Sequence, residues 1–415
     1  MHSRLTTDHS EVTFCVDSVT THQTRLDVIK SNIQRPMNKL DTRRDAIRGF
    51  SPAWFTASMA TGMTSMLLYG FPYKWKPLEY IGIGIALLNL VMFVFFMILF
   101  LWRLIQYRDF GSLILHPQQS MALGAVPMAL TTIITSLVTI LTPYNPSWMP
   151  MLALVLWSIA ITFSVLSFMV IPFLATSHQR HDFSKVNATL LLPIVPTVVA
   201  ASAGAVLASV HTGITAVAII LISYALLAMG VGLSMLFIAS YIIRLVLFKL
   251  PPPEIIFTVF IPIGPMGQSS YAIQLLGVQA LRVLPDSLPQ LQYLGHVLHD
   301  IGFLFGLLMW AFAFWWVAHA IYSVVYTRIH GPVPFNLGWW AIIFPTGTFA
   351  ASCAQLGVLT GFTFFRVLAS LVTSCIVVIW IVVIFGTLCY AWTGELLKPA
   401  NINILELNTE VPDDR

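Results

Sequence analysis

The sequence predicts an all-α integral membrane protein with ten transmembrane helices. Hydrophobic residues make up 57% of its 415 residues and charged residues only 9%, and its mean hydropathy of +0.83 is far above that of a soluble domain. Apolar runs long enough to cross a bilayer core of about 30 Å recur along the chain. We expect the spans at residues 52–70, 78–104, 117–142, 148–171, 187–210, 214–241, 256–282, 296–326, 339–358 and 364–392.

These spans form one transporter domain, residues 47–395, between two polar tails at residues 1–46 and 396–415. The first tail lacks the apolar stretch of a signal peptide. With an even number of spans, nearly all Lys and Arg residues lie on the side of the two termini, and positive charge marks the cytoplasmic side of membrane proteins. Both termini are therefore expected in the cytoplasm. The four exceptions are Lys74, Lys76, Arg282 and Arg366.

Glycine, proline and hydroxyl-bearing residues separate the odd-numbered spans from the even-numbered ones. The even spans, such as 78–104 and 364–392, are almost uniformly aliphatic and aromatic. A helix break in hydrocarbon costs several kcal/mol unless protein or water satisfies the freed backbone groups. In a single span such residues are better explained by close helix packing. Their recurrence on five alternate spans indicates repeated helical hairpins, with the odd helices around one axis.

The residues expected along this axis are the small, hydroxyl-bearing and proline residues of the odd spans, together with one glutamine. Residues 260–268 show the pattern most strongly, because two prolines, two glycines and the glutamine interrupt an apolar run. The candidates are Ser58, Thr61, Gly62 and Ser65 in the first span, Gly124, Pro127 and Thr131 in the third, Pro193, Pro196 and Thr197 in the fifth, Pro262, Gly264, Pro265, Gly267 and Gln268 in the seventh, and Pro345, Thr346 and Gly347 in the ninth.

Three basic residues stand at the predicted inner ends of spans. Arg103 and Arg244 close even spans, and His116 opens the third span. As an inner mouth, they would raise the local concentration of anions. The alternatives are a snorkelling anchor for each arginine and a fixed helix start before Pro117 for the histidine.

The middle of every span is free of charged residues, which bears on what the axis would carry. Cation paths are usually marked by intramembrane Asp or Glu. A neutral path with hydroxyls and freed N–H groups suits small anions, although lipid burial alone also explains the missing charge. An intramembrane enzyme would need convergent nucleophile, base or metal residues, and a pump driven by ATP would need a nucleotide motif. We therefore expect a transporter, not an enzyme, without metal or cofactor.

Four separated blocks resemble the tellurite-resistance/dicarboxylate transporter family, which includes the slow anion channels. They are FSPAWF at 50–55, HPQQS with GAVPM within 116–128, IPIGPMGQ at 261–268 and WWAIIFPTGT at 339–348. The blocks occur in the same order as in the family, and within it they are most similar to the fungal sulfite efflux members. The resemblance extends over residues 47–395.

The resemblance implies a fold, a gate and a substrate. The fold is five helical hairpins around a pseudo-fivefold pore, and the family places a phenylalanine across the pore on the ninth helix, which is Phe344 here. Sequence alone would assign this residue to packing, since it is one of 28 phenylalanines. The implied activity is efflux of sulfite or bisulfite across the plasma membrane by a homotrimer. An anion channel or a proton-linked malate carrier of the same fold is the alternative.

Overall fold

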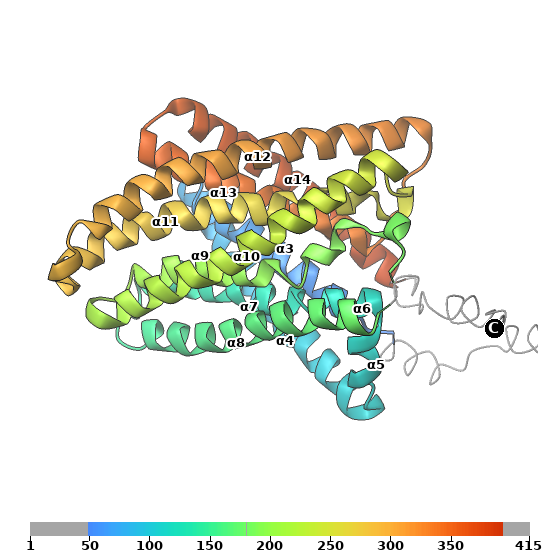
Figure 1. Ribbon diagram of the computed structural model, residues 1–415, viewed down its shortest axis with the longest axis horizontal. Helices are drawn as coiled ribbons and strands as arrows, with labels where there is room; N and C mark the ends of the chain where they lie inside the picture. The colour runs from blue at the N-terminus through green and yellow to red at the C-terminus, as the bar shows by residue number, and fades with distance from the viewer. Residues whose placement is uncertain (1–48, 180, 393–415) are drawn as a thin grey trace, which may run out of the picture.

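The computed structural model describes residues 49–179 and 181–392, and every regular element within them is a helix (Figure 1). The two predicted tails, residues 1–46 and 396–415, lie wholly outside these residues. Among the described residues, seven helical segments are long and apolar enough to cross a membrane. They are α4 (Lys76–Tyr107), Pro117–Leu141, α8 (Met149–Ser177), α10 (Gly213–Phe248), α12 (Leu294–His330), Leu337–Thr360 and Thr363–Ala391. The all-α membrane class is thus confirmed.

The other three expected spans differ from these seven in length or polarity. The first and fifth spans contain only α3 (Phe55–Tyr69) and α9 (Val195–Ala208), of 15 and 14 residues. A short 3-10 segment precedes each and takes up part of the apolar run. The seventh span contains α11 (Ile263–Ser287), which has 25 residues but carries several glutamines and serines. Its polarity, and not its length, sets it apart.

Each odd span consists of a short leading segment and a longer helix. The leading segments are η1 (Pro52–Trp54), α6 (Pro117–Ala122), η4 (Ala188–Leu191), η5 (Pro253–Phe260) and η7 (Leu337–Ile342). The longer helices are α3, α7 (Ala125–Ser136, continued by the π-helical turn η2, Leu137–Leu141), α9, α11 and α13 (Ile343–Thr360). Three small elements complete the connections: α5 (Phe110–Leu115), η3 (Phe183–Lys185) and η6 (Pro289–Leu291).

Four of the five leading segments begin with the same kind of cap. The side chains of Ser51, His116, Asn187 and Asn336 each accept the backbone N–H of the residue two positions further along. Such caps satisfy N–H groups that have no partner inside the helix. Four of the five hairpins therefore share this local detail at the start of the odd span.

The longer helices of the odd spans form an inner ring. α3 contacts α7, α7 contacts α9, α9 contacts α11, α11 contacts α13, and α13 contacts α3. The helices α4, α8, α10, α12 and α14 (Thr363–Trp392) form an outer layer, and each packs on its own ring helix and on the next one. Figure 1 shows α8, α11 and α12 running along the long axis of the molecule, with α12 near the top of the view and α8 near the bottom.

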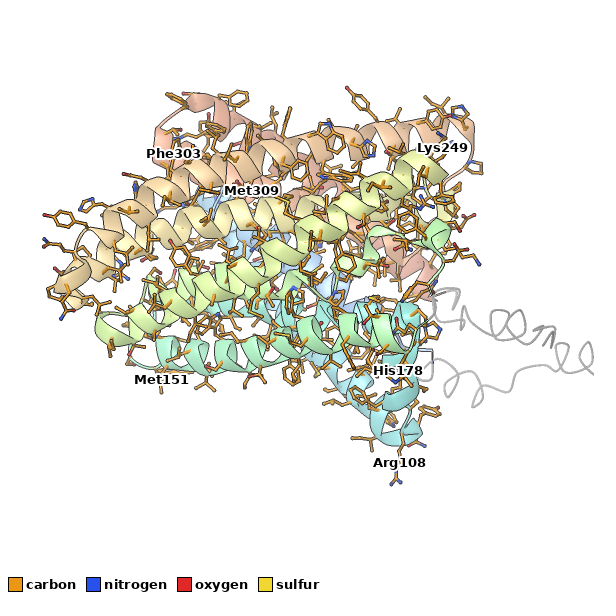
Figure 2. The ribbon with its side chains drawn as sticks, viewed as in Figure 1. Arg108, Met151, His178, Lys249, Phe303 and Met309 are labelled. Atoms are coloured by element: carbon orange, nitrogen blue, oxygen red, sulfur yellow. The ribbon has the colours of Figure 1, made fainter. Side chains whose placement is uncertain are left out.

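The outer helices bury one narrow stripe each. In α8 the buried residues recur every three or four positions, which places them on one side of a helix. The rest of the surface is apolar and exposed, and Figure 2 shows side chains such as Met151 projecting from it. In a membrane this surface faces lipid, so packing and not water exclusion holds the layers together. Gly302 of α12, for example, lies so close to the Ile273 carbonyl that an added Cβ would be 2.7 Å from it.

Candidate functional site

The predicted hydroxyls of the odd spans use their protons inside the protein. Ser58 donates to Asn89 Oδ1 at 2.7 Å and Ser65 donates to the Gly82 carbonyl at 2.8 Å, both on α4. The threonines donate to carbonyls three or four residues earlier on their own helices. These are Thr61, Thr131, Thr197 and Thr346, at 2.8, 2.7, 2.9 and 2.7 Å. A hydroxyl carries one proton, so donation to an anion would first require one of these bonds to open.

Four predicted glycines lie where neighbouring ring helices touch. An added Cβ would meet Thr132 of α7 at Gly62, Thr348 of α13 at Gly267, and Met63 of α3 at Gly347. At Gly124 it would meet the backbone carbonyl of Leu192, just before α9. These glycines allow the ring to close. Gly264 differs, because its nearest neighbour would be Pro345 at 3.8 Å.

The predicted prolines are all buried and mark helix starts. Pro127, Pro265 and Pro345 are each the third residue of a ring helix, and Pro196 is the second residue of α9. The first backbone N–H groups of a helix have no intrahelical partner, so a proline there removes no hydrogen bond. In the third, fifth, seventh and ninth spans the break is thus the junction between the leading segment and the ring helix. Pro193 and Pro262 lie within two such junctions.

Phe344 is the second residue of α13 and is only 2% exposed. It belongs to a continuous buried apolar cluster with Met63 of α3, Met128 of α7, Val199 of α9 and Met266 of α11. All five ring helices therefore contribute to one apolar cluster. Phe344 lies one helical turn before Gly347 and Thr348, the residues through which α13 meets α3 and α11.

Gln268 connects two ring helices. Its side chain is 4% exposed, and its Nε2 donates to Ser202 Oγ of α9. Ser202 in turn donates to the Val199 carbonyl at 2.9 Å. The structure therefore brings together predicted residues of the seventh and ninth spans, through Gly267 and Gly264, and joins the seventh to the fifth through Gln268.

The two inner arginines are buried and anchor backbone. Arg103 is 5% exposed, donates to the Phe50 carbonyl at 2.5 Å and to Gln119 Oε1 at 3.3 Å, and pairs with Asp109 at 2.7 Å. Its contact with Phe50 fixes the chain just before η1.

Arg244, also 5% exposed, donates to the carbonyls of Ser184 at 2.7 Å and Lys249 at 2.6 Å. Each arginine thus holds the chain ahead of the odd span of its own hairpin. Attraction of anions by these two residues stays a prediction.

His116 is the cap of α6 and lies just outside the third span. Its Nδ1 accepts the N–H groups of Gln118 at 3.3 Å and Gln119 at 3.4 Å. Burial lowers the pKa of His116 below its usual value, and a backbone hydrogen bond opposes part of this shift. The neutral imidazole is the form that accepts these bonds. The structure therefore supports the helix-start interpretation of His116.

Sequence reasoning missed Asn89, which is 1% exposed in the otherwise apolar α4. It accepts from Ser58 of α3 and donates to Thr132 of α7 at 3.1 Å. The feature of the sequence that could have identified Asn89 is that it is a single amide in the otherwise apolar run 78–104. Because a buried amide requires partners, Asn89 fixes one outer helix to two ring helices.

The ring, its outer layer and the uncharged interior define a multi-pass membrane protein of the channel and transporter class. Residues 49–388 match the model of the voltage-dependent anion channel family (SLAC1), and the chain belongs to this family. Its members are membrane channels and transporters and do not form an enzyme family. The resemblance drawn from the four sequence blocks is confirmed.

Individual relatives show in more detail what this chain is similar to. The chain is 34% identical over 375 residues to the sulfite efflux pump SSU1 of Trichophyton rubrum, covering 88% of this chain and 98% of the relative. It is 27% identical over 374 residues to SSU1 of Candida albicans, covering 85% and 74%. It is 21% identical over 403 residues to the malic acid transport protein of Schizosaccharomyces pombe, covering 92% and 89%.

Proposed function

We propose that the protein exports sulfite or bisulfite across the plasma membrane through the centre of the inner ring. The observation that carries this proposal is a closed ring of five helices, whose only charged residues, Arg282 and Asp286, lie near the end of α11. A path without fixed charge holds anions weakly and releases them. The substrate rests on the similarity to proteins named sulfite efflux pumps.

The proposed pore has five hairpins in pseudo-fivefold arrangement, making ten membrane-crossing segments. Its support is the cyclic order of ring contacts, the repeated division of odd spans and the repeated caps. The proposal places both termini in the cytoplasm. An interior-negative potential drives anions outward through such a path by about 2.3 kcal/mol per charge per 100 mV. Export then needs no other energy source. A homotrimer, one pore in each subunit, stays part of the proposal.

The proposed gate is Phe344. Viewed down the axis of α13, the side chain of residue 344 leaves the helix in a direction between those of residues 347 and 348, because one turn contains about 3.6 residues. Gly347 meets α3 and Thr348 meets α11, so the side between these contacts is directed at the ring's centre. A buried aromatic ring within an apolar cluster from all five helices blocks ions sterically and by dewetting.

The substrate is tested in proteoliposomes that contain the purified full chain. We expect sulfite efflux well above that of protein-free vesicles, at a rate that grows with an imposed interior-negative potential. Malate is the comparison substrate, because the similarity to a malic acid transport protein supports a dicarboxylate carrier as the second candidate. Transport of malate without sulfite would replace the first candidate by the second.

The gate is tested by Phe344→Ala in the same vesicles at equal protein abundance. Opening the apolar cluster is expected to raise anion flux by about tenfold, equivalent to about 1.4 kcal/mol of barrier. Phe385→Ala is the matched control, since Phe385 is 64% exposed on the outer helix α14. An unchanged flux in Phe344→Ala, with folded protein recovered, would remove this residue from the gate.

A further inference from the structure

Gln268 has a polar atom that the fold leaves unused. Among the described residues, its Oε1 is one of the buried side-chain oxygens without a hydrogen-bond partner. Burying an unpaired amide oxygen costs free energy. In the wall of the proposed path, this unpaired oxygen is an acceptor available to a passing ion.

The orientation of the amide follows from its neighbour. Ser202 Oγ has one hydrogen, which it donates to the Val199 carbonyl at 2.9 Å. Ser202 is therefore an acceptor toward Gln268, and the amide must direct Nε2 at α9. This leaves Oε1 as the free acceptor, while Nε2 still carries a second hydrogen.

The side chain lies on the inner side of α11. Gly267 meets α13, and Gln268, one residue later, meets α9, so the surface between them is directed at the ring's centre. Gly264 lies one turn earlier, where an added Cβ would approach no atom closer than 3.8 Å. An added Cβ at Gly264 would make ordinary van der Waals contact with Pro345, so this part of the wall is packed less tightly than at Gly267.

We propose that Gln268 recognises a monoprotonated oxyanion, with Oε1 accepting the hydrogen of the anion and Nε2 donating to one of its charged oxygens. This inference rests on the proposed function and narrows its substrate. Bisulfite has both a hydrogen and acceptor oxygens. Chloride, nitrate and the sulfite dianion have no hydrogen, so they would leave Oε1 unpaired against negative charge. The dianion also costs more to bury, because the penalty rises steeply with charge.

The experiment compares bisulfite and nitrate flux in proteoliposomes at one mildly acidic pH. Nitrate is a small monovalent oxyanion without a hydrogen. The ratio of the bisulfite flux to the nitrate flux therefore reports the hydrogen bond from the anion to Gln268 Oε1. Gln268→Met keeps a similar length and removes both polar atoms. We expect the bisulfite-to-nitrate ratio to fall by about tenfold, the effect of losing one hydrogen bond to a charged group, with nitrate flux retained.

Gln274→Met is the matched control. Gln274 is on the same helix and also has a buried Oε1 without a partner, but its Nε2 bonds to Ser270, on the side that packs against α12 and α13. We expect its flux ratio to equal that of the wild type.

Ser202→Ala removes the acceptor that orients the amide and should lower the ratio less than Gln268→Met does. An unchanged ratio in folded Gln268→Met, or an equal fall in Gln274→Met, overturns the inference. A wild type that moves nitrate but no bisulfite overturns the proposed substrate instead.

Discussion

The inner ring and the outer layer are both apolar, but they bury their residues very differently. In the ring spans Pro117–Leu141 and Leu337–Thr360, 67% of the most apolar stretch is buried, compared with 22–44% in the outer helices. All 14 residues of α9 are buried, whereas α8 buries only one stripe. High hydropathy therefore does not mark the buried layer: the outer spans have mean hydropathies of 2.0–2.9, against 1.5–1.8 in these two ring spans, and are the less buried. The reason is that lipid is as apolar as a protein core.

The difference is sharpest at glycines. At Gly124 an added Cβ would collide with the Leu192 carbonyl, while at Gly84 of α4 it would meet nothing within 4 Å. Backbone cannot rotate away as a side chain can, so the same substitution has opposite consequences in the two layers.

The largest expected effect is therefore that of Gly124→Val compared with Gly84→Val. The first should prevent recovery of folded protein in detergent, because overpacking at a backbone contact costs about 3 kcal/mol or more. The second should behave as the wild type in size-exclusion chromatography and thermal aggregation. Similar recovery of both variants would contradict the tight closure of the ring at α7 and α9.

Much of this comparison was predictable from the sequence. The alternation of broken and uniform spans identified the ring helices, since glycine and proline change local backbone requirements that no lipid can satisfy. Three spans escaped a simple length and hydropathy test, because leading segments shorten α3 and α9, and glutamines make α11 polar.

The detailed use of each polar residue was less predictable. Thr131 and Thr197 have the same sequence signature as a pore-lining residue, yet each donates to a carbonyl of its own helix. Arg103 and Arg244 look like surface charges at span ends but are buried anchors. Which way a side chain points depends on helix rotation, and that rotation is set by contacts between spans far apart in sequence.

A smaller loss of stability is expected for Arg103→Gln, which we compare with Arg108→Gln at the inner end of α4. Removing Arg103 leaves Asp109, whose side chain is only 22% exposed, without its cation and frees the Phe50 carbonyl. Breaking such a partly buried pair costs about 2–3 kcal/mol. Arg108 is exposed and points away from the helices (Figure 2), so its substitution should cost under about 0.5 kcal/mol.

Thermal midpoints of the two variants in the same detergent provide the measurement. We expect a clearly lower thermal midpoint for Arg103→Gln and an unchanged midpoint for Arg108→Gln. Equal midpoints would mean that the contact between Arg103 and the chain before η1 does not stabilise the ring. Attraction of anions would then be the better interpretation of Arg103.

The smallest expected effect is a dependence on pH at His116. Burial lowers its pKa in the folded protein, so the unfolded chain binds the proton first as the pH falls. The stabilisation by His116 is therefore complete above its ordinary pKa of about 6.5 and is lost as the pH decreases through and below that value. Protonated Nδ1 no longer accepts from Gln118 and Gln119. The loss should not exceed about 1 kcal/mol, the usual contribution of an N-cap.

His116→Asn tests this directly, because asparagine is a good N-cap that does not titrate in this range. Between about pH 8 and about pH 5, the thermal midpoint of the wild type should fall by more than that of the variant. Other groups titrate equally in both proteins, so the difference between the two slopes isolates this one cap. Parallel slopes would show that the α6 cap keeps its hydrogen bonds on acidification, and the inner end of the third span would then be held by Arg103 and Gln119 instead.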